Sequence, residues 1–118
     1  MYRIRVRWVG EDPRAALSAE SDLSKSQVRT IEQQLARMDA RSRHGAWTHD
    51  VLTLVAAHPE RRAADLADML GRDKDALKLD IRKLKNLGLT HSLDVGYRIS
   101  PRGSAYLRAR AEDLDTKG

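Results

Sequence analysis

The fold is constrained most by residues 63–89, AADLADMLGRDKDALKLDIRKLKNLGL, in which a Gly-Arg-Asp break separates two amphipathic segments. Apolar residues recur every three or four positions on both sides of the break, which predicts a helix, a tight turn and a second helix. The first segment places three apolar residues on one face: Leu66, Met69 and Leu70. The second places four on one face: Leu77, Ile81, Leu84 and Leu87. Two short helices cannot form a core alone, so the flanking chain must pack against them.

Local signals set the limits of these helices and predict the elements after them. Gly71 supplies a left-handed turn and Asp73 is a good N-cap for the second helix. Residues 86–89, Asn-Leu-Gly-Leu, suit a glycine C-cap. Residues 90–93 and 97–99 read as short strands around Asp94-Val95-Gly96, which predicts a β-hairpin. Ser100-Pro101 then begins a last helix to about residue 111, and a frayed tail is expected at 112–118.

The N-terminal part of the chain carries a different pattern. Residues 2–9 alternate strictly and predict a half-buried β-strand. One face holds Tyr2, Ile4, Val6 and Trp8, and the other holds Arg3, Arg5 and Arg7. The arginine row is either an edge that tracks phosphates or a solvated face that protects the strand from aggregation. Pro13 suits the first turn of a short helix to about residue 19.

Two further helices are predicted before residue 60. Ser24 is a plausible N-cap for a long helix to about residue 43. Its apolar stripe has spacings of three, four and three: Val28, Ile31, Leu35 and Met38. This stripe either packs on its own domain or pairs with a second copy as a dimerisation surface. The next helix covers residues 49–58, with Thr48 as N-cap and Pro59 as its stop. Trp47 is expected to pack at the junction of the two helices.

Composition narrows the class of function. The 118 residues form one domain with at most a small appendage, and the net charge of +5 favours an anionic partner such as nucleic acid. There is no cysteine, signal peptide or membrane-spanning segment, which suits a cytoplasmic protein. No phosphate loop, nucleophile elbow or catalytic carboxylate pair is visible, and the four histidines are scattered. We therefore expect neither an enzyme nor a bound metal or cofactor.

The segment LADMLGRDKDALKLDIRKLKNLGLT together with GYRISPRGSAYL resembles bacterial regulators of the ArsR, MarR and PadR kind. The shared pattern is Leu-Ala in the second helix, Leu-Gly before the recognition helix, Leu-Gly-Leu before the wing, and Tyr-x-Ile-Ser-Pro-x-Gly after it. The resemblance implies a mainly α (α+β) fold: a winged helix-turn-helix at 47–111, extended by an N-terminal β-strand and long helix at 1–46 and a flexible tail at 112–118.

The same resemblance implies where DNA would lie. The recognition helix, residues 73–87, would enter the major groove, and the wing, residues 90–100, would lie on the backbone or in the minor groove. Six helix residues project off the apolar face: Lys74, Asp75, Lys78, Leu79, Arg82 and Lys83. The lysines Lys74 and Lys78 would reach guanine acceptors or phosphates. Arg82 and Lys83 would contact phosphates. Five further contacts are expected from the wing and the preceding helix start: Arg61, Arg62, His91, Arg98 and Arg102.

Three carboxylates oppose this interpretation, because an acidic helix is repelled by phosphates. Asp73 is explained as a cap, and Asp75 could accept a hydrogen bond from a cytosine amino group. Asp80 has no such explanation. Leu79, opposite the apolar face, either touches a thymine methyl group or marks a protein interface.

The expected function is sequence-specific double-stranded DNA binding by a bacterial, cytoplasmic, homodimeric transcriptional regulator. The main alternative is a winged-helix module for protein–protein interaction that does not bind DNA, with the long stripe and Leu79 as its contact surface. RNA binding through the arginine strand ranks last, because that strand offers too few aromatic side chains for base stacking.

Overall fold

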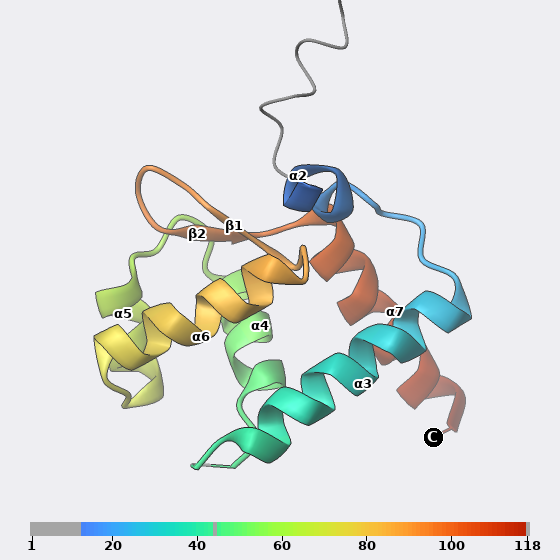
Figure 1. Ribbon diagram of the computed structural model, residues 1–118, viewed down its shortest axis with the longest axis horizontal. Coiled ribbons are helices and arrows are strands. Elements are labelled where there is room, and N and C mark those ends of the chain that lie inside the picture. The colour runs from blue at the N-terminus through green and yellow to red at the C-terminus, as the bar shows by residue number, and fades with distance from the viewer. Residues whose placement is uncertain (1–12, 44, 118) are drawn as a thin grey trace, which may run out of the picture.

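The computed structural model describes residues 13–43 and 45–117 (Figure 1). In chain order the elements are α2 (Pro13–Ser18), α3 (Lys25–Arg41), α4 (Thr48–Ala57), α5 (Ala63–Leu70), α6 (Lys74–Asn86), β1 (Thr90–Ser92), β2 (Tyr97–Ile99) and α7 (Pro101–Lys117). The protein is mainly helical with a small two-stranded antiparallel sheet, which confirms the predicted class at that level. The predicted strand at 2–9, with its arginine row and Trp8, lies outside the described residues.

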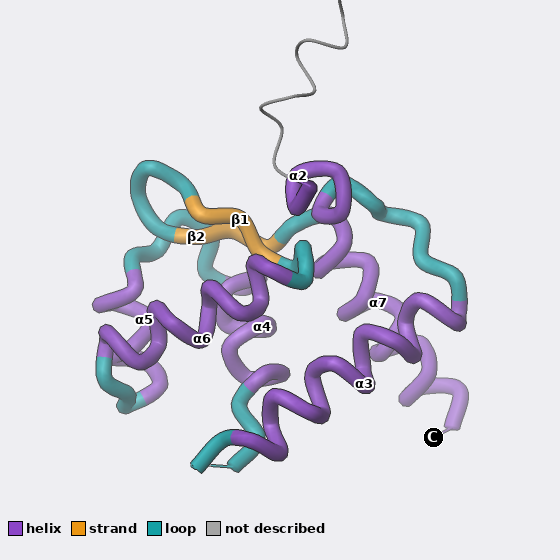
Figure 2. Tube along the Cα trace, in the orientation of Figure 1, coloured by secondary structure: helices purple, strands orange, loops and turns teal. Residues whose placement is uncertain are grey.

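The central element is α4, which contacts α3, α6, α7 and β2. On one side α5 packs against α6, and the β1–β2 hairpin lies along α6 and α4. On the other side α3 crosses α7, and α2 lies against α7 near the start of that helix (Figures 1 and 2). The α5–α6 pair and the hairpin therefore form one end of the molecule, and α3 with the end of α7 forms the other.

One hydrophobic core joins the two ends. Its buried members come from α3, α4, α5, α6, α7 and the segments after α3 and α6: Ile31, Leu35, Trp47, Val51, Leu52, Val55, Leu66, Ala67, Leu77, Ile81, Leu84, Leu89 and Tyr106. Trp47 packs where α3 meets α4, as predicted.

The apolar stripe of α3 belongs to this core. Ile31 is 0% exposed and Leu35 is 4% exposed, and the partly buried Val28 and Met38 pack against the same cluster. The stripe therefore packs on its own domain, which was one of the two predicted alternatives, and Ile31 and Leu35 are not available as a dimerisation surface. The physical reason is that α4 and α7 cover the stripe within one chain.

The buried face of α5 also differs from the prediction. Met69, expected on the inner face, is 46% exposed. The inner face instead holds Ala63, Leu66 and Ala67, with Leu70 partly buried. The two alanines bring α5 close to its neighbours, so the helix turns its small residues inward and Met69 outward.

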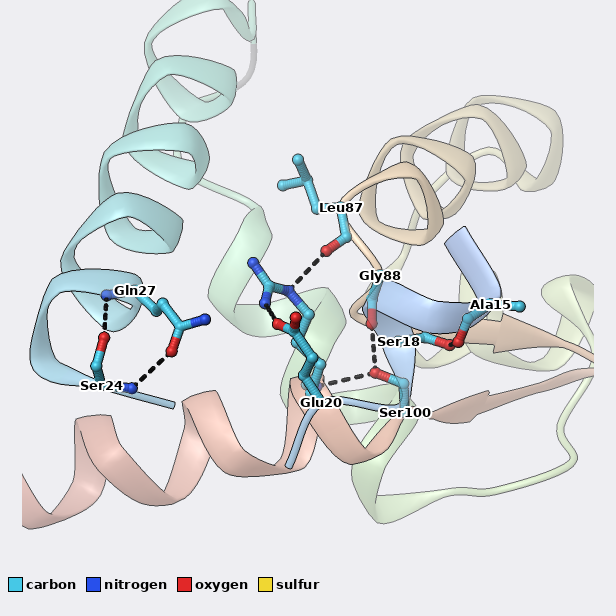
Figure 3. Close-up of polar contacts among 10 residues, drawn as sticks. Ala15, Ser18, Glu20, Ser24, Gln27, Leu87, Gly88 and Ser100 are labelled. Carbon is cyan, nitrogen blue, oxygen red and sulfur yellow. Dashed lines mark hydrogen bonds and ion pairs between the residues drawn. The ribbon is translucent and has the colours of Figure 1, made fainter. Parts of the chain in front are cut away.

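Most predicted caps are confirmed. Ser24 and Gln27 form a reciprocal capping box at the start of α3, in which the Ser24 hydroxyl accepts from the Gln27 N–H at 3.1 Å (Figure 3). The Asp73 carboxylate accepts from the Ala76 N–H at 2.9 Å. The Ser100 hydroxyl accepts from the Gly103 N–H at 2.9 Å. Gly71 is left-handed, with a φ of 64°.

The start of α4 is held differently from the prediction. Thr48 is the first helical residue rather than the N-cap, and Trp47, at the cap position, makes no side-chain cap bond. The carboxylate of Asp39, from α3, takes that role. It accepts from the N–H groups of Trp47 and Thr48 at 2.8 and 2.9 Å and from the Thr48 hydroxyl at 2.8 Å. A side chain from another helix therefore caps α4.

The C-terminal ends of α3 and α7 also differ from their predicted positions. The helix α3 ends at Arg41, slightly before the predicted residue 43. The helix α7 continues to Lys117, so the prediction of a frayed tail from residue 112 is wrong. No proline or glycine occurs after residue 111 until Gly118, and the intervening sequence has no strong helix breaker.

The hairpin pairs Thr90 with Ile99, His91 with Arg98 and Ser92 with Tyr97. The segment between α4 and α5 adds an edge to β2: the Glu60 N–H donates to the Tyr97 carbonyl at 2.8 Å, and the Tyr97 N–H donates to the Arg61 carbonyl at 3.2 Å. Gly96 has a φ of 81°, and a Cβ there would collide with the Arg61 carbonyl. The hairpin is thus fixed beside the start of α5.

Candidate functional site

The polar surface of α6 divides into three rows, because Leu77, Ile81 and Leu84 point into the core. The flank beside the hairpin, here called the hairpin flank, carries four cations: Lys74, Lys78, Arg82 and Lys85. The outer row, opposite the core, carries Asp75 and Leu79. The far flank carries Asp80 and Lys83. The charges of this helix are therefore segregated by side.

The hairpin flank forms one wall of a groove. One hollow of about 350 Å³ is lined by Lys78, Arg82, Lys85, Ser92 and Tyr97. A second, of about 470 Å³, reaches the start of α5 and the hairpin tip. The two hollows share Lys78, Ser92 and Tyr97, so they adjoin, and we call their combined surface the basic groove.

The basic groove is strongly positive. Five cationic side chains line it: Arg62, Lys74, Lys78, Arg82 and Lys85. The only carboxylate among its described lining residues is Asp94, at the hairpin tip. Arg62, at the N-cap position of α5, makes no side-chain cap bond, so the start of α5 faces the same groove with its backbone donors uncapped by that residue. A groove of this charge attracts extended anions.

Tyr97 lines both hollows of the basic groove. Burial raises the pKa of Tyr97 above its ordinary value of 10.0, and the nearby positive charge of Arg82 opposes that rise. The phenol is therefore protonated at neutral pH. It can both donate and accept a hydrogen bond, which adds a neutral donor to the cations.

The far flank of α6 is internally neutralised. The Asp80 carboxylate lies 2.5 Å from the Arg72 guanidinium and 3.5 Å from the Lys83 ammonium. The Lys83 ammonium also lies 6.0 Å from the centroid of the Trp47 ring. The Asp80 carboxylate therefore does not repel phosphates at the basic groove, because its charge is paired and it lies on the far flank. The predicted phosphate contact Lys83 consequently lies on the opposite flank from Arg82.

The outer row is exposed. Leu79 is 60% exposed, and the exposed Asp75 carboxylate makes no ion pair within the described chain. Asp75 differs in this from Asp73, which caps α6, and from Asp80. These two outer-row positions agree with their predicted outward placement.

The hairpin separates the residues predicted in it. Ser92 and Tyr97 pair across the strands and face the basic groove. His91 and Arg98 form the adjacent pair, which alternation places on the other face of the hairpin. His91 lines a separate hollow of about 280 Å³ beside α2. Lys85 of α6 also lines this hollow, but neither His91 nor Arg98 lines the basic groove.

Arg102 is a correction to the predicted contacts. It is only 7% exposed, because its guanidinium turns inward beneath the end of α6. Its Nε donates to the Leu87 carbonyl at 3.1 Å and its Nη1 lies 2.6 Å from the Glu20 carboxylate (Figure 3). Both partners belong to the same chain, so this arginine links α7 to the end of α6 and to the segment before α3. The exposed Arg61 contacts the hairpin through its backbone, and Arg62 lines the basic groove.

Sequence reasoning missed three residues of the basic groove: Lys85, Ser92 and Tyr97. Lys85 is seven residues beyond Lys78, so helical periodicity alone could have placed it on the hairpin flank. Period-two alternation in the hairpin could have placed Ser92 and Tyr97 on one face, but not against α6.

Within the described residues there is no group of three or more histidine or carboxylate side chains arranged to hold a metal ion. No helix in that part of the chain has the length and apolar character needed to cross a membrane. Comparisons with protein-family models, with curated proteins and with solved structures found no match to this chain.

Proposed function

We propose that this chain is a winged helix-turn-helix protein that binds double-stranded DNA as a transcriptional regulator. In this proposal α5 and α6 are the helix-turn-helix, α6 is the recognition helix and the hairpin is the wing. The observation that carries it is the charge segregation on α6. Four cations without ion pairs in the described chain line the hairpin flank, while Asp80 is neutralised on the far flank.

The shape of the site supports a duplex partner. The cations from Lys74 to Lys85 extend over about 16 Å of helix, given a rise of about 1.5 Å per residue. An extended polyanion matches a row of this length better than a small isolated anion does. The outer side of α6 is exposed, and a helix about 10–12 Å wide fits the major groove, which is about 12 Å wide. The Ser92 and Tyr97 side of the wing would then meet the backbone beside the groove.

In this proposal the α3 stripe does not join two copies, because Ile31 and Leu35 are in the core of one chain. The proposal is tested by the affinity of the chain for labelled duplex DNA at increasing salt concentration. Four phosphate contacts predict that log K falls linearly with log salt, with a slope of about −3 to −4. Lack of measurable binding at about 50 mM salt would contradict DNA binding, since phosphate contacts dominate affinity under those conditions.

A matched pair of variants tests the assigned flank. Lys78 and Lys83 are exposed residues of the same helix, on the hairpin flank and the far flank respectively. We expect Lys78→Glu to weaken duplex binding by about tenfold or more and to reduce the salt slope by about one, the effect of one lost phosphate contact. Lys83→Glu should change affinity much less.

Circular dichroism and thermal unfolding serve as controls for both variants, because Lys83 also contacts Asp80. Equal losses of affinity in the two folded variants would show that net charge, rather than the basic groove, determines binding.

The second candidate is a protein-interaction module. The observation that favours it is the exposure of Leu79 and Met69, 60% and 46% respectively, since large exposed apolar side chains often mark protein contacts. This candidate predicts no salt-dependent duplex affinity and a stable complex with another protein that Leu79→Ala weakens. The salt titration therefore separates the two candidates.

A further inference from the structure

The carboxylates of α6 have different roles. Asp73 accepts a hydrogen bond from the Ala76 N–H, and Asp80 is paired with Arg72 and Lys83. Asp75 is exposed and, of the three, is the one with neither a cap hydrogen bond nor an ion pair within the described chain. An unpaired carboxylate on a helix that approaches phosphates reduces affinity for every sequence, unless a specific donor meets it.

Leu79 lies one helical turn after Asp75 and on the same outer row. It is 60% exposed, whereas Leu77, Ile81 and Leu84 of the same helix are buried in the core. The cations without ion pairs in the described chain flank this row along the basic groove, whereas Lys83, on the far flank, is paired with Asp80. The positions that project furthest from the core are therefore a hydrogen-bond acceptor and an apolar side chain.

We infer, on the basis of the proposed DNA binding, that the outer row selects pyrimidines in the major groove. Asp75 accepts a hydrogen bond from the N4 amino group of a cytosine, and Leu79 packs against the C5-methyl group of a thymine. A carboxylate is an acceptor only, so it is repelled by the O6 and N7 acceptors of guanine and by phosphates. The thymine methyl group is the apolar feature of the major-groove edge.

The spacing of the two residues restricts the class of duplex. Four residues correspond to about 6 Å along α6. That distance is about two base-pair steps, since each step rises about 3.4 Å. The preferred duplex therefore carries a cytosine and a thymine within about two base pairs of each other. Lys78 and Arg82 supply affinity that does not depend on sequence, and Asp75 reduces binding most where it faces the two acceptors of guanine.

The first experiment selects binders from a pool of short duplexes with randomised centres, using the full chain. Each thymine of the selected duplex is then replaced by deoxyuridine, which lacks only the C5-methyl group. We expect one replacement to weaken binding by about fourfold, the effect of one buried methyl group. Leu79→Ala should bind the thymine and deoxyuridine duplexes equally well. Met69→Ala, which changes an exposed apolar residue of α5, should keep the fourfold preference.

The second experiment repeats the selection with Asp75→Asn. Asparagine donates and accepts, and it pairs with the N6 and N7 atoms of adenine. We expect the preferred base at one position near the sensitive thymine to change from cytosine to adenine, with a change in relative affinity of about tenfold. Asp68→Asn, which makes the same change at an exposed position of α5, should select the parental duplex.

The results distinguish this inference from the function on which it rests. If duplexes are selected but no thymine is sensitive, or if Leu79→Ala keeps the preference for thymine, the role of Leu79 is overturned while DNA binding stands. Selection of the parental cytosine by Asp75→Asn overturns the role of Asp75 in the same way. If no duplex is selected from the pool at all, DNA binding is wrong and pyrimidine selection with it.

Discussion

The helices α3 and α6 carry similar apolar stripes, yet their polar surfaces differ. In α3 the stripe is Val28, Ile31, Leu35 and Met38, and in α6 it is Leu77, Ile81, Leu84 and Leu87. Both stripes enter the same core. Beside the α3 stripe, Asp39 is used internally to hold the start of α4. Beside the α6 stripe, four cations without ion pairs in the described chain line the basic groove. An apolar stripe shows that a helix is buried, and the polar residues beside it show whether a surface is left for a partner.

The largest expected effects test whether the two stripes are equivalent. Ile31 and Ile81 are 0% and 1% exposed. We expect Ile31→Ala and Ile81→Ala each to lower the free energy of unfolding by about 2–5 kcal/mol, because each leaves a cavity in a packed core. Urea denaturation measures the change, with the exposed Leu79→Ala as a control that should change it little.

A different result would restore the dimerisation role of α3. That result is an Ile31→Ala variant with parental stability and a smaller mass in solution than the parent chain.

An intermediate effect on stability is expected when Asp39 of α3 is replaced, and a smaller one when Asp75 of α6 is replaced. Asp39 accepts three hydrogen bonds from Trp47 and Thr48, whereas Asp75 makes no ion pair in the described chain. Asp39→Ala should lower the free energy of unfolding by about 1–3 kcal/mol, because it leaves donors at the start of α4 unsatisfied. Asp75→Ala should change it by less than about 0.5 kcal/mol.

Asp39→Asn is the matched control, since its amide oxygen can still accept from the two backbone N–H groups. It should recover part of the loss. Equal stability of the Asp39→Ala and Asp75→Ala variants would contradict the assigned cap.

The smallest expected effect is the alkaline pH dependence of stability. Burial raises the pKa of Tyr106 above 10.0, and Glu32 and Asp39 of α3 add to the rise while Arg110 opposes it. Burial also raises the pKa of Tyr97, beside α6, where Arg82 opposes the rise. The unfolded chain releases each phenol proton near pH 10.0, whereas the folded chain retains it. This contribution to stability is complete below about pH 10 and is lost as the pH rises through the folded pKa values.

We expect Tyr106→Phe to flatten the loss of stability above about pH 10, and Tyr97→Phe to flatten it less, because Tyr106 is 1% exposed whereas Tyr97 is only partly buried. Urea denaturation between about pH 8 and 11 measures both. An unchanged pH dependence in Tyr106→Phe would contradict the assigned effect of burial.

Sequence reasoning predicted the features that depend on neighbouring residues. The caps at Ser24, Asp73 and Ser100 and the left-handed Gly71 arise from signals within a few positions. The helices and the hairpin arise from the spacing of apolar residues, with differences at their ends. For the candidate site, the outward positions of α6 were predicted, including Lys74, Lys78 and Arg82 in the basic groove.

The features that were missed join distant parts of the chain. Asp39 caps a helix that begins nine residues later, and Arg102 pairs with Glu20 across 82 residues. A charged residue in a sequence does not reveal which distant partner it will meet, because periodicity fixes only the face of its own element. For this reason Arg102 was expected on DNA and Asp80 had no explanation. The division of α6 into two charged flanks became visible only when the hairpin, Arg72 and Trp47 were placed around it.

The ion pair between Arg102 and Glu20 links α7 to the segment before α3, so the chain cannot be divided between these two parts without breaking it. The segment before α3 supplies the counter-charge for a guanidinium that also donates to the Leu87 carbonyl at the end of α6. A cut near residue 46 would remove both this carboxylate and the stripe of α3 that covers α4. We therefore expect the unit that folds cooperatively to include residues before α3, with Glu20 stabilising the end of α6 through Arg102.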